Sequence, residues 1–173
     1  MTRLPILTWG DARLRQVARP VGDITDAVRR LADDMTETMY DAPGRGLAAP
    51  QVGVGLRMFV IDAHWKDGAP RAPLVMIDPD IAWRSADTAT HEEGCLSIPG
   101  VPAPITRPAA VTLRWTGLDG TARERRLEGT EAVCAQHEYD HLDGVLITDR
   151  MAPDLLAAAQ AALDDLARAG GTA

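Results

Sequence analysis

The sequence predicts an α+β fold. Capped or amphipathic segments that favour helices lie near the start, in the last third and at the end of the chain, and short β-type runs lie between the first two. Because helices and strands do not alternate regularly, a doubly wound parallel sheet is not expected. With 173 residues and no Pro/Gly/Ser-rich linker, the chain fits a single domain over residues 1–173.

The first helix is expected from about Asp26 to Tyr40. Asp23 or Thr25 can cap its start, and Pro43 and Gly44 follow its end. Apolar residues recur in it at helical spacing: Val28, Leu31, Met35 and Met39.

Short β-type runs follow the first helix at Leu56–Asp62, Leu74–Asp78 and Val111–Trp115. The turn sequence Leu118–Thr121 separates the last of these runs from Ala122–Leu127. An Asp-Gly turn between two such runs predicts a β-hairpin.

Two further helices are expected in the last third. One spans about Thr130 to Leu142, with Thr130 as its cap and Gly144 just past its end. The other spans residues 153–169, with a proline in its first turn and glycines after its end. It carries an apolar stripe suited to packing on the body of the protein: Leu155, Leu156, Ala159, Leu163 and Leu166.

Composition excludes several function classes. No apolar run reaches the roughly 18 residues that span a bilayer, and the N-terminus does not resemble a secretory signal, so a cytoplasmic protein without membrane association is expected. The net charge is −7 and the eighteen Lys and Arg residues are scattered. DNA or other nucleic-acid binding needs a basic surface, which this sequence does not predict.

The two cysteines, Cys95 and Cys134, are too few for a disulfide framework. Each thiol is then a packing residue, a nucleophile or a metal ligand, and a lone free cysteine most often packs as a small apolar residue.

The pattern His-Glu-x-x-His lies on the second predicted helix. Residues four apart share a helical face, so His137 and His141 can direct their rings at one metal ion. Glu138 flanks that ion and can act as a general acid and base. The alternative is a pair of ordinary surface or core histidines. Asp140 is the better candidate for a carboxylate that orients one of the rings, and Asp143 is expected to be solvated.

A catalytic site with two histidines needs a third protein ligand and one open position. No histidine follows His141, whereas Cys95 lies upstream in Glu92–Gly100. A thiolate there would complete the ligand set and would suit Fe(II) as well as Zn(II).

The segment Gly44–Gly53 is rich in glycine and other small residues, which permits close approach of a ligand to the backbone. Gln51 could direct its amide at that ligand. Taken alone, this segment is only a glycine-rich loop, and it lacks the Gly-Lys-Ser/Thr of a phosphate-binding loop.

Three stretches together resemble the peptide deformylase family: Gly44–Gln51, Glu93–Ser97 and Gln136–His141, which match its Gly-x-Gly-Leu-Ala-Ala-x-Gln, Glu-Gly-Cys-Leu-Ser and Gln-His-Glu-x-x-Asp-His motifs in order. The resemblance extends over most of residues 4–152. It implies antiparallel sheets around a central helix that carries His-Glu-x-x-His, followed by a C-terminal helix. It also implies a hydrolase that removes the formyl group from the N-terminal methionine of new polypeptides.

The resemblance assigns a role to each matched residue. Cys95, His137 and His141 would bind one divalent metal ion, Fe(II) in the first instance, with Zn, Ni or Co as substitutes. Glu138 would act on the attacking water. Gln51 and the backbone N–H of Leu96 would donate hydrogen bonds to the formyl oxygen as it becomes an oxyanion. The backbone of Gly46 would pair with the extended peptide substrate.

The pocket for the methionine side chain is where the sequence departs from the family. Cys134 and Val133 resemble its walls, although Val133 could equally be a packing residue. Arg45 stands where the family often has an aliphatic residue, and we expect its stem along the wall and its charge in water. Pro102 stands where some relatives have an arginine or an aromatic residue, and we expect a rigid edge or loop there.

Partners and rival functions follow from the same residues. Nascent N-formylmethionyl peptides are the expected substrates. A basic C-terminal helix can engage the ribosome in bacterial relatives, but here Asp154, Asp164 and Asp165 oppose Arg168, so ribosome docking through residues 153–169 is not expected. The rivals are a metallopeptidase, suggested by the helix motif alone, and a metal-retaining homologue that binds peptides without catalysis.

Overall fold

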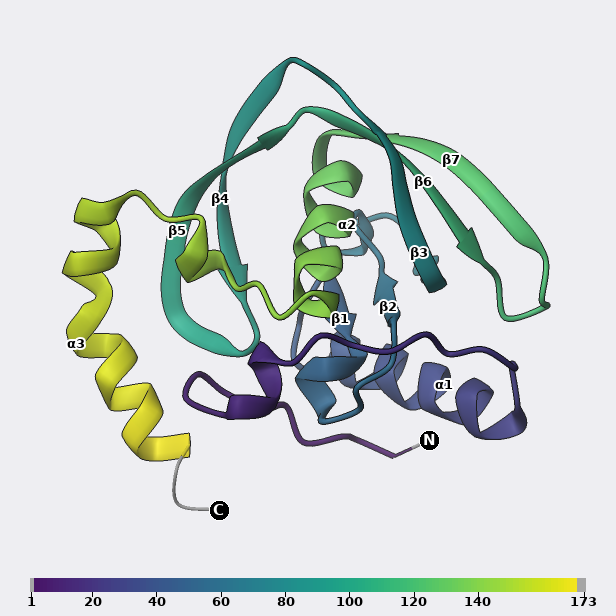
Figure 1. Cartoon of the computed structure of the whole chain (residues 1–173), viewed down its shortest axis with the longest axis horizontal. Coiled ribbons are helices and arrows are strands. Elements are labelled where there is room, and N and C mark those ends of the chain that lie inside the picture. The colour runs from purple at the N-terminus through teal and green to yellow at the C-terminus, as the bar shows by residue number, and fades with distance from the viewer. Residues whose placement is uncertain (1, 171–173) are drawn as a thin grey trace.

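The computed structural model describes residues 2–170, which form three α-helices, seven strands and four short 3₁₀-helices (Figure 1). The α-helices are α1 (Asp26–Asp41), α2 (Gly129–Leu142) and α3 (Pro153–Gly170). The strands are β1 (Gly46–Ala48), β2 (Met58–Ile61), β3 (Leu74–Arg84), β4 (Thr88–Cys95), β5 (Ile98–Pro108), β6 (Ala110–Thr116) and β7 (Ala122–Glu128). The 3₁₀-helices are η1 (Ala12–Arg15), η2 (Ala49–Val52), η3 (Trp65–Asp67) and η4 (Ile147–Asp149).

Two antiparallel sheets enclose α2. One has five strands in the order β1-β2-β3-β6-β7, and the other consists of β4 and β5. Figure 1 shows α2 between them, with α1 below the larger sheet and α3 against the outer side of β5. This arrangement confirms the expected α+β fold with antiparallel sheets around a central helix and a C-terminal helix.

The core explains why α2 can lie inside the protein. Its buried positions include the small residues Ala132 and Ala135, which let strands approach the helix closely. The residues that pack around them are large and apolar: Phe59, Met76, Leu113, Leu127 and Leu142. A helix buried on most sides can carry functional side chains that are shielded from bulk water.

The helices predicted from the sequence are present, with one correction at a cap. Thr25 caps α1 by accepting a hydrogen bond from the backbone N–H of Val28 at 3.4 Å. The start of α2 differs from the prediction, because the N-cap position is Glu128 and no side chain caps it. Gly129 has a φ of +54°, which lets the chain turn from β7 directly into the helix. Thr130 therefore lies in the first turn.

The apolar stripe of α3 is confirmed except at Leu155. Leu163 is buried, and Leu156, Ala159 and Leu166 pack against the same cluster on the body of the protein. Leu155 is instead 37% exposed. It lies about 100° around the helix from Leu156, at the solvent side of the stripe.

The predicted hairpin is confirmed as β6 and β7, whereas β1, β4 and β5 were not predicted from the sequence. β5 contains prolines at positions 99, 102, 104 and 108, which usually argue against a strand. Within residues 2–170 it pairs only with β4, which leaves its other edge without a partner strand. An edge strand tolerates proline because an N–H group on the unpaired edge is not needed for pairing. The region around Pro102 is thus a rigid edge strand.

Within the described part of the chain, no helix combines the length and the hydrophobicity that crossing a membrane requires.

Candidate metal centre and active-site cavity

Three metal-binding side chains from two elements converge beside α2. His137 and His141 lie one turn apart on the helix with ring centroids 5.1 Å apart, and Cys95 ends β4. All three are buried, and their ligand atoms lie within 4.8 Å of one another. Cys95 Sγ is 3.4 Å from His141 Nε2. Tetrahedral ligands at zinc-like bond lengths lie about 3.5 Å apart, so this donor set fits one divalent metal ion.

The two imidazoles differ in their electrostatic state. Burial holds the pKa of His141 well below its usual value, so its ring is neutral and can donate a lone pair. Burial also opposes the charged form of His137, but its hydrogen bonds to Cys95 and Glu93 outweigh that effect and raise its pKa. Among residues 2–170, these three side chains form the one cluster with this ligand geometry.

Glu93 orients His137, which corrects the expectation for Asp140. Glu93 Oε2 lies 2.9 Å from His137 Nδ1. It can reach the ring because it lies two residues before Cys95 on the same strand, and both side chains are buried. Asp140 contacts no histidine in the described structure and instead accepts hydrogen bonds from Arg107 and Arg150. Three residues along α2 from His137, it faces these arginines.

A chain of buried charges therefore supports the metal centre. Arg107 donates Nε and Nη2 to the two oxygens of Glu93 at 2.6 and 3.0 Å, and its Nη1 donates to Asp140 Oδ2 at 2.8 Å. The side chains of Arg107 and Glu93 are only 3% and 4% exposed. Although burial opposes the charged form of Glu93, the hydrogen bonds from His137 and Arg107 hold its pKa below the usual value.

The role of Arg107 was not predicted from the sequence, although the pattern of residues along β5 contains a signal for it. Buried and exposed residues alternate along β5, with Val101, Ala103 and Ile105 buried. The next position in that series is Arg107, so the alternation places a guanidinium inside the protein. A buried arginine requires carboxylate partners, and Glu93 is one of them.

Glu138 lies beside the centre in a water-poor position. It is 4% exposed, and within the described residues its Oε2 atom has no hydrogen-bond partner. Burial raises the pKa of Glu138 to about 7. Gly46 packs directly against it, since a Cβ at that position would lie 2.4 Å from Glu138 Oε1. A carboxyl group in this state can hold or release a proton near neutral pH.

Gln51 and Leu96 both line the cavity beside this centre. Gln51 Oε1 accepts the backbone N–H of Ala48 at 2.8 Å, which directs Nε2 toward Ser97 Oγ at 3.1 Å and Cys95 Sγ at 3.7 Å. Leu96 lies in the turn between β4 and β5 and lines the cavity. Its side chain packs against Gly44, where a Cβ would lie 2.7 Å from Leu96 Cδ1.

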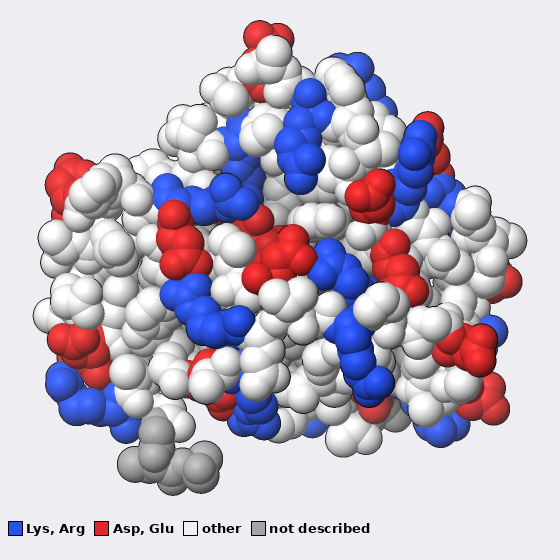
Figure 2. All heavy atoms as spheres, in the orientation of Figure 1, with Lys and Arg blue, Asp and Glu red and all other residues white. Residues whose placement is uncertain are grey.

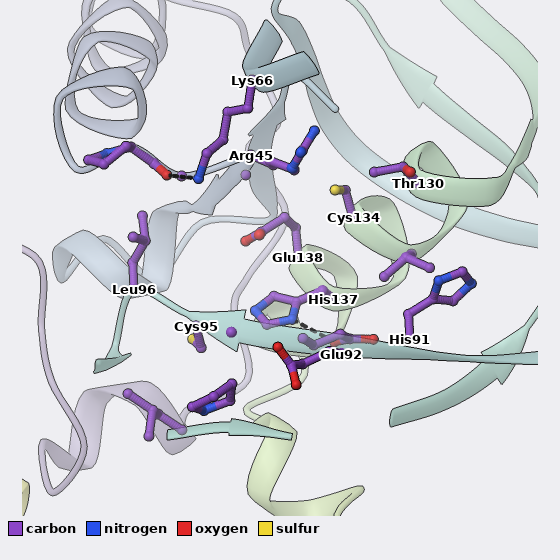
Figure 3. Close-up of a pocket in the computed structure, with 18 of the residues that line it drawn as sticks. Arg45, Lys66, His91, Glu92, Cys95, Leu96, Thr130, Cys134, His137 and Glu138 are labelled. Atoms are coloured by element: carbon purple, nitrogen blue, oxygen red, sulfur yellow. Dashed lines mark hydrogen bonds and ion pairs between the residues drawn. The ribbon is translucent and has the colours of Figure 1, made fainter. Parts of the chain in front are cut away.

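A cavity of about 540 Å³ opens beside these groups. Figure 3 shows Glu138 and His137 facing it from α2, with Cys95 and Leu96 on one side and Arg45 and Lys66 at its far end. Its lining includes Pro102 and all the residues predicted from the sequence for catalysis, metal binding or substrate binding except His141. These predicted residues are Arg45, Gly46, Gln51, Cys95, Leu96, Val133, Cys134, His137 and Glu138.

The guanidinium of Arg45 is held in an ion pair with Asp67, whose side chain is 54% exposed. Its Nη1 and Nη2 atoms donate to the two oxygens of Asp67 at 2.9 and 2.8 Å, and Nη1 also donates to the backbone carbonyl of Ala63. Cys134 is half-buried in the same wall, and burial raises the pKa of its thiol to about 12, so the thiol is neutral.

Comparison with known proteins gives one consistent result. A family model described as "Polypeptide deformylase" matches residues 3–155. A peptide deformylase of Afipia carboxidovorans is 52% identical over 144 residues, 83% of this chain and 84% of that protein. A peptide deformylase of Rhodopseudomonas palustris is 47% identical over 147 residues, 84% of each chain.

Solved structures agree with these relatives. The crystal structure of a peptide deformylase from Legionella pneumophila matches with a TM-score of 0.89 and 38% identity, covering 99% of each chain. A peptide deformylase from Synechococcus elongatus, solved in complex with actinonin, matches with a TM-score of 0.84 and 39% identity, covering 98% of this chain and 89% of that one.

Proposed function

The chain belongs to the peptide deformylase family, and from this premise we propose a role for each residue of its active site. It is a metal-dependent hydrolase that removes the N-formyl group from the N-terminal methionine of newly made polypeptides. The alternatives suggested by the helix motif, a metallopeptidase or a non-catalytic homologue, do not fit these matches.

Cys95, His137 and His141 would hold the metal ion, which we propose to be Fe(II), with Zn, Ni or Co able to replace it. The thiolate supports this choice, because one soft and two borderline donors accept several divalent metals. A metal bound there supplies Lewis acidity to the formyl oxygen and lowers the pKa of water. Glu93 holds the ring of His137 in the orientation that turns Nε2 toward this site.

Glu138 is the proposed general base and acid. Its unpartnered Oε2 can accept a proton from the attacking water and later deliver it to the leaving amine of the peptide. Burial raises the pKa of Glu138 to about 7, so both protonation states are accessible near neutral pH. The missing side chain of Gly46 leaves the space that Glu138 occupies.

Gln51 Nε2 and the backbone N–H of Leu96 are the proposed donors to the formyl oxygen as negative charge develops on it. Support for Gln51 comes from its fixed orientation, since Oε1 is held by Ala48. A donor fixed before reaction needs no reorganisation when charge appears.

The peptide would bind along the glycine-rich edge of the cavity. Gly46 would pair with the extended substrate backbone, and Val133, Cys134 and the Arg45 stem would form walls for the methionine side chain. The neutral thiol of Cys134 supports this assignment, because an uncharged wall suits an apolar side chain.

The single observation that carries these roles is the meeting of a Cys/His/His donor set and a buried, proton-holding Glu138 at one cavity. Glu138→Gln tests it. Metal content should be unchanged because Glu138 is not a ligand, while kcat/KM on formyl-Met peptides should fall by about 10²–10⁴. Metal analysis of anaerobically purified protein would show whether the native ion is iron.

Glu131→Gln is the matched control, because Glu131 lies on the same helix and pairs with Arg125 at the surface. Its activity should equal that of the wild type. Near-normal deformylation by Glu138→Gln would refute the proposed acid–base role.

We propose that the enzyme works as a single domain in the cytoplasm, without membrane, DNA or ribosome attachment through α3. On the face in Figure 2, acidic and basic side chains are interspersed rather than segregated. The only basic residue of α3 is Arg168, and it pairs with Asp165. Counterion release needs an array of free cations, so this helix is unsuited to binding RNA.

A further inference from the structure

The segment Ala63–Asp67 fixes the edge of the cavity that carries Arg45. Lys66 Nζ donates to the carbonyl of Pro43 at 2.7 Å, and Trp65 Nε1 donates to the carbonyl of Gly44 at 2.9 Å. The backbone N–H of Asp62 donates to the carbonyl of Arg45 at 2.8 Å. With the backbone held in this way, the direction of the Arg45 side chain depends on its own partners.

Asp67 is the charged partner that sets this direction. It binds both terminal nitrogens of Arg45 in a fork, the geometry in which a carboxylate neutralises a guanidinium most fully. The cavity lining includes Arg45 and Lys66 but, among residues 2–170, not Asp67. The carboxylate therefore acts on the cavity only through the arginine that it holds.

Lys66 is the other charged residue at this end of the cavity, and its ammonium group is held at the carbonyl of Pro43. Figure 3 shows Cys134 next to Arg45, and Cys134 and Val133 are both among the residues that line the cavity. An arginine without its partner would leave a net positive charge against an apolar wall, where an acidic side chain would be attracted. A methionine side chain gains nothing from such a charge.

We propose that Asp67 is a specificity-determining residue that acts through Arg45, neutralising its guanidinium so that this end of the cavity accepts an uncharged first side chain. This inference rests on the proposed function, in that the first side chain of the substrate lies at this end. Asp67 is a positioning residue, since among the described residues it lies outside the lining of the cavity.

The test compares formyl-Glu and formyl-Gln peptides, which differ in charge but hardly in size. In Asp67→Asn the ratio of their kcat/KM values should rise at least about fivefold over wild type, because one charge is left uncompensated. In Arg45→Met the guanidinium is absent, so the ratio should stay near the wild-type value. Adding Asp67→Asn to that variant should then leave the ratio unchanged, because Asp67 acts through Arg45.

Glu124→Gln is the matched control. It removes one carboxylate from another exposed arginine ion pair, Arg114–Glu124 on β6 and β7, and should leave the ratio unchanged. Melting temperatures measured on all variants would show that each is folded.

An unchanged ratio in Asp67→Asn would overturn the inference, as would a raised ratio that persisted in the double variant. Failure of the proposed function looks different, because wild-type protein would then fail to deformylate formyl-Met peptides at all.

Discussion

Two arginine–carboxylate forks with similar nitrogen–oxygen distances lie at different ends of the active site, one through Nε and Nη2 of its arginine and the other through Nη1 and Nη2. Behind the metal centre, Arg107 donates two hydrogen bonds to Glu93 with nitrogen–oxygen distances of 2.6 and 3.0 Å. At the edge of the cavity, Arg45 donates two hydrogen bonds to Asp67 with nitrogen–oxygen distances of 2.9 and 2.8 Å. The inner pair is 3% and 4% exposed, whereas the outer pair is 30% and 54% exposed.

The difference in exposure gives the two forks different functions. Buried ions lose their hydration, so each partner of the inner fork depends on the other, and loss of one leaves an uncompensated charge inside the protein. Water screens the outer fork, so it adds little to stability. It can still control charge locally at the cavity. Hydrogen-bond geometry alone therefore does not reveal what an ion pair contributes.

The largest expected effect is on the inner fork. Arg107→Met would leave Glu93 and Asp140 without their shared partner, although Arg150 would still contact Asp140. The free energy of unfolding should fall by about 3–5 kcal/mol. Urea unfolding at matched metal content measures it. A loss comparable to that of Arg114→Met at the exposed Arg114–Glu124 ion pair would remove the distinction between buried and exposed ion pairs.

A smaller effect is expected when the inner fork keeps its shape but loses charge. Glu93→Gln retains a hydrogen-bonding side chain next to His137, but it cannot stabilise the ring as a carboxylate does. Metal affinity should fall by about 10–100-fold. Competition with a chelator measures this change. A larger loss in Asp140→Asn than in Glu93→Gln would show that the wrong carboxylate has been assigned to His137.

The smallest expected effect is on the stability of the outer fork. Asp67→Asn should leave the denaturation midpoint unchanged within error, because water already solvates both partners. The same variant is expected to change substrate selectivity, so thermal denaturation and kinetics on one preparation separate the two properties. A clear loss of stability would mean that the outer fork also supports the loop from Pro43 to Gly46.

Local patterns explain why much of the fold could be predicted. The helices α1 and α3 follow from apolar spacing and from residues at their ends, and the β6–β7 hairpin follows from its Asp-Gly turn. The strands β4 and β5 were not predicted because their sequences contain charged residues and prolines. A two-stranded sheet with a free edge tolerates these residues, but only the pairing of the strands reveals that edge.

By itself, the sequence determined the positions of His137, Glu138 and His141 on one helix, because helical geometry is set by residues only a few positions apart. It also offered Cys95 as a third ligand and Gln51 as an amide donor, and resemblance to a family then gave these two residues specific roles. Only the tertiary structure decided that Glu93 rather than Asp140 orients His137, and that Asp67 holds Arg45. Arg107 joins β5 to β4 and α2, and Arg45 meets a residue 22 positions away. Such contacts depend on how distant segments pack, which local spacing does not specify.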